Sequence, residues 1–200
     1  MSASSPYNFI PRGEGQSRSP CPGLNTLANH GYISRDGKDL TVMELVCALC
    51  NVYNLSYPLA LLLSIVAIVF CGHGLKICLE DLAKHNLIEH DGSLVHDDCL
   101  PGQHIATSTP SQVRLQDLIH RTGNKQSLSL NDLARVRADR ESKLQVPLDR
   151  LHSQISTAES ALTWLTMKDE HGEVPLENIK EWFGEEGSLK DGCAPKSPSA

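Results

Sequence analysis

Cys21 lies in the run Ser19-Pro20-Cys21-Pro22, directly before a segment with helical character. Proline suits the first position of a helix, where its missing N–H is not needed, so Cys21 stands at a predicted helix N-terminus. The N–H groups of a first turn act as a partial positive charge and stabilise a thiolate. A thiolate held in this way is suited to be a nucleophile, a metal ligand or the axial ligand of a haem. The alternative is a structural cysteine in a proline-rich turn.

A second candidate is the segment Glu89-His90-Asp91-Gly92-Ser93. It brings carboxylate, imidazole and hydroxyl groups together around a glycine turn. Oxygen-rich sets of this kind suit a hard divalent cation such as Mg²⁺ or Mn²⁺. The alternative is a charged turn that is simply solvated.

A third candidate is Glu159, which lies within an apolar stripe of helical spacing. The stripe is formed by Leu151, Ile155, Ala158, Leu162 and Leu165. Because Glu159 lies four residues after Ile155 and three before Leu162, we expect it on the inner face of the helix. A carboxylate there must be paired, protonated or line a cavity, which makes it a candidate general acid or base. The alternative is an edge position whose carboxylate reaches water.

The chain has seven cysteines, an odd number, so at least one is free, ligated or paired between chains. Cys47 and Cys50 form a C-x-x-C pair in an apolar segment, which predicts core thiols, with half of a zinc site as the alternative. Cys71, Cys78 and Cys99 could contain one disulfide in an exported protein. We predict that the cysteines other than Cys21 are mostly reduced.

The elements that must position these residues are helices. Caps, glycines, prolines and apolar spacing predict helices over residues 23–30, 42–52, 57–71, 75–84, 113–121, 129–143, 147–167 and 175–183. Thr41 and Glu44 match a capping box. The apolar run 58–71 is too short for a membrane span and predicts a buried core helix, with an interfacial helix as the alternative. No strand pattern is sustained, so we predict an all-α fold.

Composition limits the class of protein further. The chain carries 18 Lys+Arg and 24 Asp+Glu, a net charge of −6, which argues against nucleic-acid binding. A length of 200 residues predicts one domain, here over residues 1–186, followed by a flexible tail over 187–200. Residues 1–20 contain no signal-peptide pattern. The chain as given is therefore expected to be intracellular, with secretion of a processed form as the alternative.

Several motifs together resemble the fungal haem-thiolate peroxidases, the chloroperoxidase and unspecific peroxygenase family. The run 19–33, SPCPGLNTLANHGYI, resembles the family's proximal motif, and residues 89–93, EHDGS, resemble its second motif. Weaker matches are Tyr7-x-Phe9-x-Pro11, the RADRES segment at 137–142 and the GEVP segment at 172–175. The resemblance spans roughly residues 7–186, and its first motif is long and specific. The chain is shorter than is usual for the family, and we expect the region 100–150 to be the part that is trimmed.

The resemblance implies an all-α domain that encloses haem b, with the iron on Cys21. It also implies Glu159 as the acid–base residue, oriented by His90 as in the short-chain members, and Mg²⁺ or Mn²⁺ beside a haem propionate. The remaining implied positions are the N–H groups of Gly23 and Leu24 near the sulfur, the cation ligands Glu89, His90 and Ser93, and an aliphatic pocket wall at Ile88, Ala158 and Leu162.

The function expected from the resemblance is a peroxygenase or peroxidase that uses hydrogen peroxide on small apolar organic substrates. One alternative is a catalytically altered haem-binding relative, dehydratase-like or non-oxygenating. A second is a helical protein associated with a membrane through residues 58–71. A third is a zinc or redox protein that uses Cys47 and Cys50.

Overall fold

A computed structural model of the chain describes residues 6–123 and 125–184, and they form two compact units that divide after Leu82. The family-like motifs are divided between them, with Cys21 in the first unit and His90 and Glu159 in the second. Each unit is described by itself below. The predicted tail over 187–200 and Cys193 lie outside the described residues.

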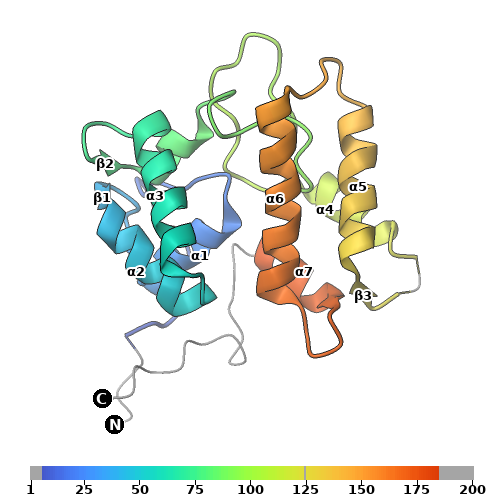
Figure 1. Cartoon of the computed structure of the whole chain (residues 1–200), viewed down its shortest axis with the longest axis horizontal. Coiled ribbons are helices and arrows are strands. Elements are labelled where there is room, and N and C mark those ends of the chain that lie inside the picture. The colour runs from blue at the N-terminus through green and yellow to red at the C-terminus, as the bar shows by residue number, and fades with distance from the viewer. Residues whose placement is uncertain (1–5, 124, 185–200) are drawn as a thin grey trace. The chain divides into compact units, whose positions relative to one another are not determined.

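The first unit contains three α-helices. They are α1 (Pro22–His30), α2 (Val42–Tyr53) and α3 (Tyr57–Cys71), joined by β1 (Leu40–Thr41), β2 (Lys76–Ile77) and the 3₁₀ helix η1 (Leu79–Ala83). The α2 and α3 helices pack side by side (Figure 1). Thr41 caps α2, since its Oγ1 accepts the N–H of Glu44 at 3.3 Å, but the Glu44 carboxylate accepts the N–H of Ser34 instead. Only half of the predicted capping box is therefore formed.

The predicted helix over 75–84 is wrong. Lys76 and Ile77 form the strand β2, which pairs antiparallel with β1, and a 3₁₀ helix follows it. The pairing places Ile77 opposite Leu40, and both side chains are fully buried. A contact between residues so far apart in the chain stabilises the extended form, and local helical spacing cannot reveal it.

The α3 helix is formed as predicted, but its burial is only one-sided. A stripe of small and medium side chains, including Ala60, Ser64 and Ile68, faces the interior. Leu62, Val69 and other large apolar side chains are exposed. The prediction of a fully buried core helix was therefore wrong within the described residues. None of the described helices is both long enough and apolar enough to cross a membrane.

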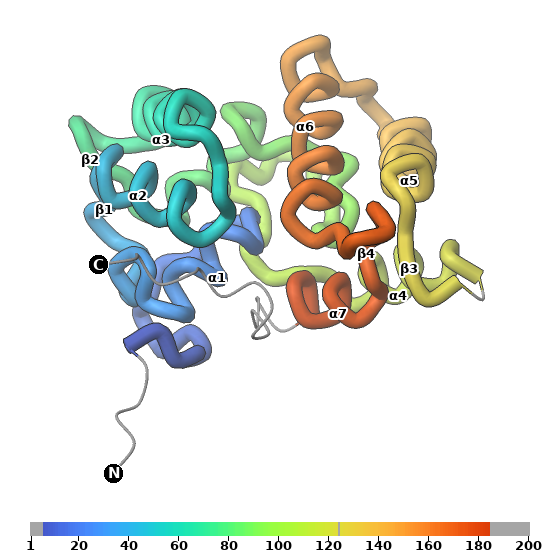
Figure 2. The backbone as a smooth tube through the Cα atoms, turned by 60° about the horizontal axis from the view of Figure 1, so that its bottom comes forward, coloured from blue at the N-terminus to red at the C-terminus, as the bar shows by residue number. Residues whose placement is uncertain are grey.

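The second unit begins with a long irregular segment that carries residues 85–99, and its helices follow. They are α4 (Gln112–His120), α5 (Leu130–Ser142), α6 (Arg150–Met167) and α7 (Leu176–Gly184), with the strands β3 (Ser127–Leu128) and β4 (Val174–Pro175). The α5 and α6 helices lie side by side, and α4 contacts α7 (Figures 1 and 2). The buried core of the second unit consists of Val95, Leu115, Leu118, Leu128, Leu133, Val136, Met167, Val174, Leu176, Ile179 and Phe183.

The all-α prediction is confirmed, because the described strands are two residues long and helices make up the rest of the regular structure. The predicted helix positions agree with α1 to α7 to within a few residues. The boundary of a domain over residues 1–186 stays a prediction.

Candidate active site

Cys21 is the N-cap residue of α1, with extended backbone angles, φ −86° and ψ 109°. Pro22 occupies the first helical turn, as its fixed φ favours. The first hydrogen bond of the helix runs from the N–H of Asn25 to the carbonyl of Cys21, at 3.2 Å. The N–H groups of Gly23 and Leu24 precede that bond, so they have no acceptor within the helix. The residue itself is exposed, so the first turn presents its positive end beside an accessible sulfur.

Two residues of the motif fix the turn before Cys21. The N–H of Ser19 donates to Asn25 Oδ1 at 2.9 Å, and Asn25 Nδ2 donates back to the Ser19 carbonyl at 2.8 Å. The Ser19 hydroxyl also accepts the N–H of Cys21 at 3.2 Å. Ser19 and Asn25 are both fully buried. The side-chain amide of Asn25 therefore holds the cysteine turn onto its own helix.

A buried arginine, Arg18, links the chain just before Ser19 to α1 and to the segment that follows it. Arg18 donates through Nη2 to Asn29 Oδ1 at 2.7 Å and through Nη1 to the Arg35 carbonyl at 3.0 Å. Its side chain is among the largest fully buried ones in the chain. Arg18, Asn25 and Asn29 were not predicted to be site residues from the sequence. The signal was present, since two asparagines at helical spacing follow the cysteine within one motif.

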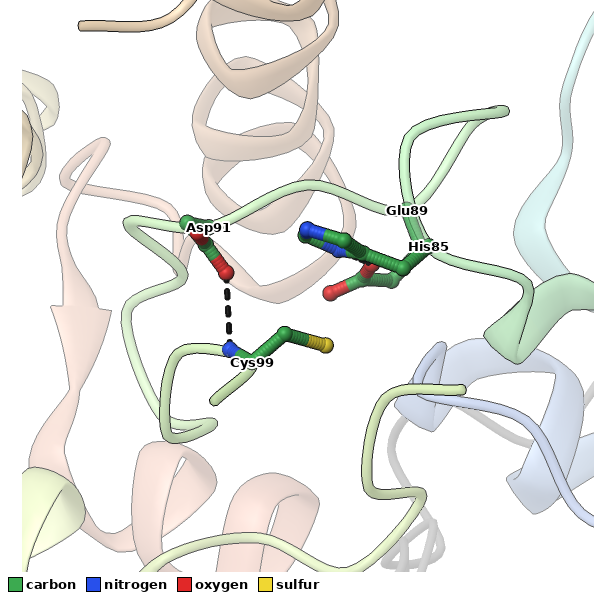
Figure 3. Close-up of side chains that lie close together, drawn as sticks. All are labelled: His85, Glu89, Asp91 and Cys99. Atoms are coloured by element: carbon green, nitrogen blue, oxygen red, sulfur yellow. Dashed lines mark hydrogen bonds and ion pairs between the residues drawn. The ribbon is translucent and has the colours of Figure 1, made fainter. Parts of the chain in front are cut away.

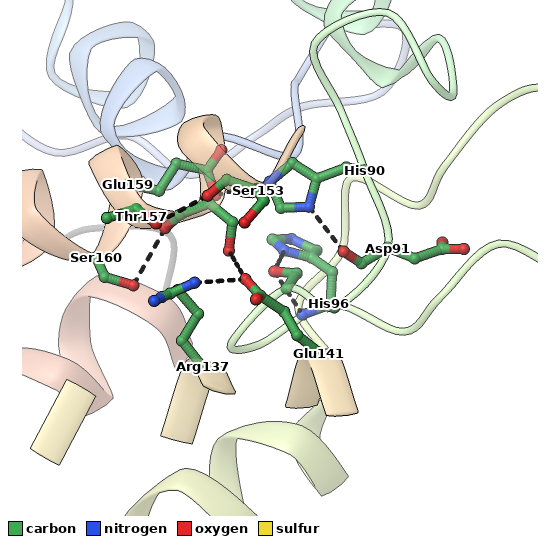
Figure 4. A network of polar contacts seen from close by, with 12 residues as sticks. His90, Asp91, His96, Arg137, Glu141, Ser153, Thr157, Glu159 and Ser160 are labelled. Carbon is green, nitrogen blue, oxygen red and sulfur yellow. Dashed lines mark hydrogen bonds and ion pairs between the residues drawn. The ribbon is translucent and has the colours of Figure 1, made fainter. Parts of the chain in front are cut away.

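In the second unit, His90 lies against Glu159 of α6. The buried His90 Nε2 is 3.5 Å from Glu159 Oε2, an ion-pair distance, while His90 Nδ1 lies 2.7 Å from the Asp91 carbonyl (Figure 4). The Nε2 atom has no hydrogen-bond partner among the described residues. Since Nδ1 can only donate to a carbonyl, Nε2 carries a proton when the ring is charged and is directed to the carboxylate.

Electrostatics favour the charged form of His90. Burial by itself lowers the pKa of His90, but the Glu159 carboxylate and the Asp91 carbonyl outweigh it and raise that pKa to about 9. His96, also buried, shows the opposite balance, because burial lowers its pKa more than the nearby Glu159 raises it. One imidazolium and one neutral imidazole therefore lie near the same carboxylate at neutral pH.

Within the second unit, Glu159 does not lie on the inner face of its helix, so that prediction was wrong. The Glu159 side chain is 57% exposed, and Leu151 and Leu165 are each 53% exposed. The predicted pocket residue Ala158 is exposed, while Leu162 and Ile88 are half-buried. The apolar stripe around Glu159 is therefore present, but it lies on the exposed face of α6. We call this face, with the Glu159 carboxylate on it, the open face of α6.

The buried face of α6 is polar, which explains the reversal. It consists of His152, Ser156, Ser160 and Met167. Ser156 donates its hydroxyl to Glu141 Oε1 of α5 at 2.8 Å, and Arg137 donates to the same oxygen at 2.7 Å (Figure 4). Small hydroxyl side chains let α5 and α6 approach closely, and hydrogen bonds offset their desolvation. Apolar periodicity cannot identify such a buried face.

The RADRES segment, which is the last part of α5, contacts the second motif and the loop after it. Arg140 is buried, donates through Nε to the Ser93 carbonyl at 3.1 Å and forms an ion pair through Nη2 with Asp98 at 2.8 Å. Gly92 begins this turn with φ +84°, a backbone conformation that favours glycine. The segment therefore serves to fix the loop that carries His90.

The predicted cation ligands Glu89, His90 and Ser93 do not gather into one cluster of side chains. His90 faces Glu159, and the Ser93 hydroxyl accepts the N–H of His96 at 3.3 Å. Glu89 instead lies with His85, Asp91 and Cys99, whose ligand atoms are all within 4.8 Å of one another (Figure 3).

The C-x-x-C pair is not a pair of core thiols, as Cys47 is exposed and Cys50 is half-buried. The residues of α2 that pack inward are Leu45, Val46, Ala48 and Val52 instead. Neither cysteine belongs to a group of neighbouring metal-ligating side chains within the described part of the chain.

Comparison with known proteins decides the family. The family described as "Peroxidase, family 2" matches residues 7–191. The chain belongs to this family of fungal haem-thiolate peroxidases. The match includes Cys21, His90 and Glu159, and haem is the cofactor that the family implies.

Three curated relatives illustrate the similarity to the peroxidase family. A chloroperoxidase of Leptoxyphium fumago is 30% identical over 218 aligned residues, which cover 96% of this chain and 58% of the relative. An aromatic peroxidase of Fusarium equiseti is 42% identical over 73 residues, 36% of this chain and 16% of the relative. An aromatic peroxygenase of Coprinellus radians is 30% identical over 111 residues, 46% of this chain and 42% of the relative. The chain thus spans between 16% and 58% of the length of these relatives.

Proposed function

We propose that the chain is a haem-thiolate peroxidase or peroxygenase that uses hydrogen peroxide to oxidise or oxygenate small apolar organic substrates. The observation that carries the proposal is the family match over residues 7–191, which includes the cysteine of the first motif and the carboxylate of α6. The geometry within each unit supports the roles that follow.

Cys21 is the residue we assign as the ligand of haem b. Its place as N-cap of α1 fits a thiolate, because the first-turn N–H groups of Gly23 and Leu24 have no helical acceptor and stabilise negative charge on sulfur. The Ser19–Asn25 hydrogen bonds hold the turn before metal binding. When bound, haem held by the Cys21 thiolate would supply the chemistry for cleaving the O–O bond of a peroxide.

Glu159 is the residue we assign as the acid–base group. Its exposed carboxylate can accept a proton from peroxide and return it to the departing oxygen. His90 is a positioning residue, because its buried charged ring lies 3.5 Å from Glu159 Oε2 and fixes the place of the carboxylate that must accept the proton. The unpartnered Nε2 of His90 is consistent with this role.

Ile88, Ala158 and Leu162 are the residues we assign to the substrate wall. Ala158 and Leu162 flank Glu159 on α6, and Ile88 precedes His90 by two residues. Aliphatic side chains therefore adjoin both Glu159 and His90 along the chain. The open apolar face of α6 suits a hydrophobic cofactor or substrate more than water.

A hard cation at Glu89, His90 and Ser93 fits the structure less well. The His90 and Ser93 side chains have other partners, and Glu89 lies among His85, Asp91 and Cys99 instead of beside them. We therefore assign no step of the reaction to Mg²⁺ or Mn²⁺.

The test is peroxide-dependent oxidation of an apolar organic substrate by the haem-loaded chain and its Glu159→Gln variant. We expect a loss of about 10²- to 10⁴-fold in turnover, the usual contribution of general acid–base catalysis. The matched control is Glu170→Gln, which changes an 88% exposed carboxylate of the same unit and should leave turnover unchanged. Equal turnover of Glu159→Gln and the parent chain would refute the assignment.

A further inference from the structure

Four metal-ligating side chains lie together in the irregular segment that opens the second unit. His85, Glu89, Asp91 and Cys99 each offer one ligand atom, and these four atoms lie within 4.8 Å of one another. Figure 3 shows the four side chains converging from two stretches of this segment. All four residues are half-buried, so the cluster is neither a surface group of acids nor a sealed core.

Hydrogen bonds already hold the two stretches together. The N–H of Cys99 donates to Asp91 Oδ1 at 2.8 Å, and the N–H of Gly92 donates to Asp98 Oδ1 at 2.8 Å. Arg140 of α5 binds that same Asp98 oxygen at 2.8 Å. The backbone around the cluster is therefore fixed by contacts that do not use the imidazole of His85 or the sulfur of Cys99.

The cluster also has an excess of negative charge. Burial, together with the carboxylates of Glu89, Asp91 and Asp98, raises the pKa of the Cys99 thiol to about 11. Burial also raises the pKa of Glu89, against the opposing effect of His85. A divalent cation placed among these groups would replace repulsion between them by attraction.

We propose that His85, Glu89, Asp91 and Cys99 form a zinc site, or more generally a site for a borderline-soft divalent metal. Imidazole nitrogen and thiolate sulfur select such a metal over Mg²⁺, which prefers oxygen. A tetrahedral zinc site with bonds of about 2.0–2.3 Å has ligand atoms about 3.3–3.8 Å apart. The four atoms therefore need to move by about an ångström, within the reach of side-chain rotation.

Binding is balanced by loss of one proton. Zn²⁺ from the medium forms a bond to Cys99 Sγ while the S–H proton passes to solvent, and the carboxylates of Glu89 and Asp91 bind as anions. No oxidant or reductant is involved. With all four side chains bound, the two positive charges of Zn²⁺ and the three negative charges of Cys99, Glu89 and Asp91 leave a formal charge of −1. Asp91 can keep its Oδ1 on the Cys99 N–H and bind the metal through its other oxygen.

The site would close the loop that carries His90. Residues 85 and 99 bracket the second motif, so a metal bound to both limits the motion of the turn at 89–93. The proposal differs from the cation set of Glu89, His90 and Ser93 in its ligands and in its metal. It does not depend on haem or on the proposed activity.

The experiment is zinc analysis and zinc-edge X-ray absorption of the full haem-loaded chain after dialysis against zinc and then excess Mg²⁺. We expect one retained zinc per chain with one sulfur ligand at about 2.3 Å and lighter ligands at about 2.0–2.2 Å. Cys99→Ser should remove the sulfur ligand, and His85→Gln should lower zinc retention about tenfold or more.

Two control variants keep the outcome decisive. Cys78→Ser alters the second group of ligating side chains, His73, Cys78 and Asp81, and Ser93→Ala alters the hard-cation set; both should retain zinc and its sulfur ligand. Zinc displaced by Mg²⁺ from the unmodified chain, or a sulfur ligand that survives Cys99→Ser, would overturn the proposal. Haem content measured on the same samples reports separately on the proposed function.

Discussion

Replacing Glu159 by glutamine removes the charge that faces His90 while keeping the size of the side chain. His90 Nε2 lies 3.5 Å from Glu159 Oε2, and the His90 ring is buried. With the carboxylate gone, burial disfavours the imidazolium, and the Asp91 carbonyl and the Glu89 carboxylate are left to oppose it. We therefore expect Glu159→Gln to lower the pKa of His90 from about 9 toward the ordinary value of 6.5.

The magnitude follows from the position of the pair. A pKa of about 9 against 6.5 for His90 corresponds to about 3 kcal/mol in favour of the charged ring. Because the Glu159 side chain is 57% exposed, water screens the pair, and we expect a measured coupling of about 1.4 kcal/mol, a tenfold change in the acid constant. Since the pKa of His90 is raised on folding, this stability is fully present below pH 6.5 and is lost as the pH rises through about 9.

The assay is NMR titration of the histidine rings in the haem-loaded, reduced and carbon monoxide-bound chain, with His90 assigned by a His90→Gln variant. The free energy of unfolding should fall between pH 6 and pH 9.5 in the parent chain, and it should fall by about 1.4 kcal/mol less in Glu159→Gln. Glu170→Gln, with its exposed carboxylate, should leave the titration of His90 unchanged. An unchanged pKa of His90 in Glu159→Gln would refute the coupling.

Three further changes test the elements that hold the site. Ser129→Ala removes the hydroxyl that caps α5 at the Asp132 N–H and should lower the free energy of unfolding by about 1 kcal/mol in urea denaturation. Arg140→Met leaves Asp98 without its buried partner, with an expected loss of about 3 kcal/mol and faster amide exchange over residues 91–99. Gly92→Ala forces a side chain into φ +84° and should lower stability by about 1–2 kcal/mol. Unchanged stability would count against each role.

Most helices could be predicted because their signals are local. Pro22 and Gly31 bracket α1, and Thr41 caps α2. The strand at Lys76–Ile77 could not be predicted, because its pairing with Leu40 and Thr41 joins segments distant in the chain. Local sequence reports propensity, whereas such pairing is decided by tertiary contact.

The candidate site was predicted in part for the same reason. The spacing around Glu159 identified the apolar face of α6 but not which face packs, since the buried face carries Ser156 and Ser160, and Ser156 donates to Glu141 of α5. Glu89 was recognised as a ligand type, but its neighbours His85 and Cys99 were not, because the loop alone brings them together. The contact of His90 with Glu159 came from family resemblance, since no spacing rule joins residues 90 and 159.

The most direct test of the central claim is the absorption spectrum of the reduced, carbon monoxide-bound, haem-loaded chain. We expect the spectrum of a thiolate-ligated haem, its loss in Cys21→Ser, and its retention in Cys47→Ser, which alters another exposed cysteine of the first unit. A thiolate spectrum that persists in Cys21→Ser, or a parent chain with the spectrum of a nitrogen-ligated haem, would contradict the central claim.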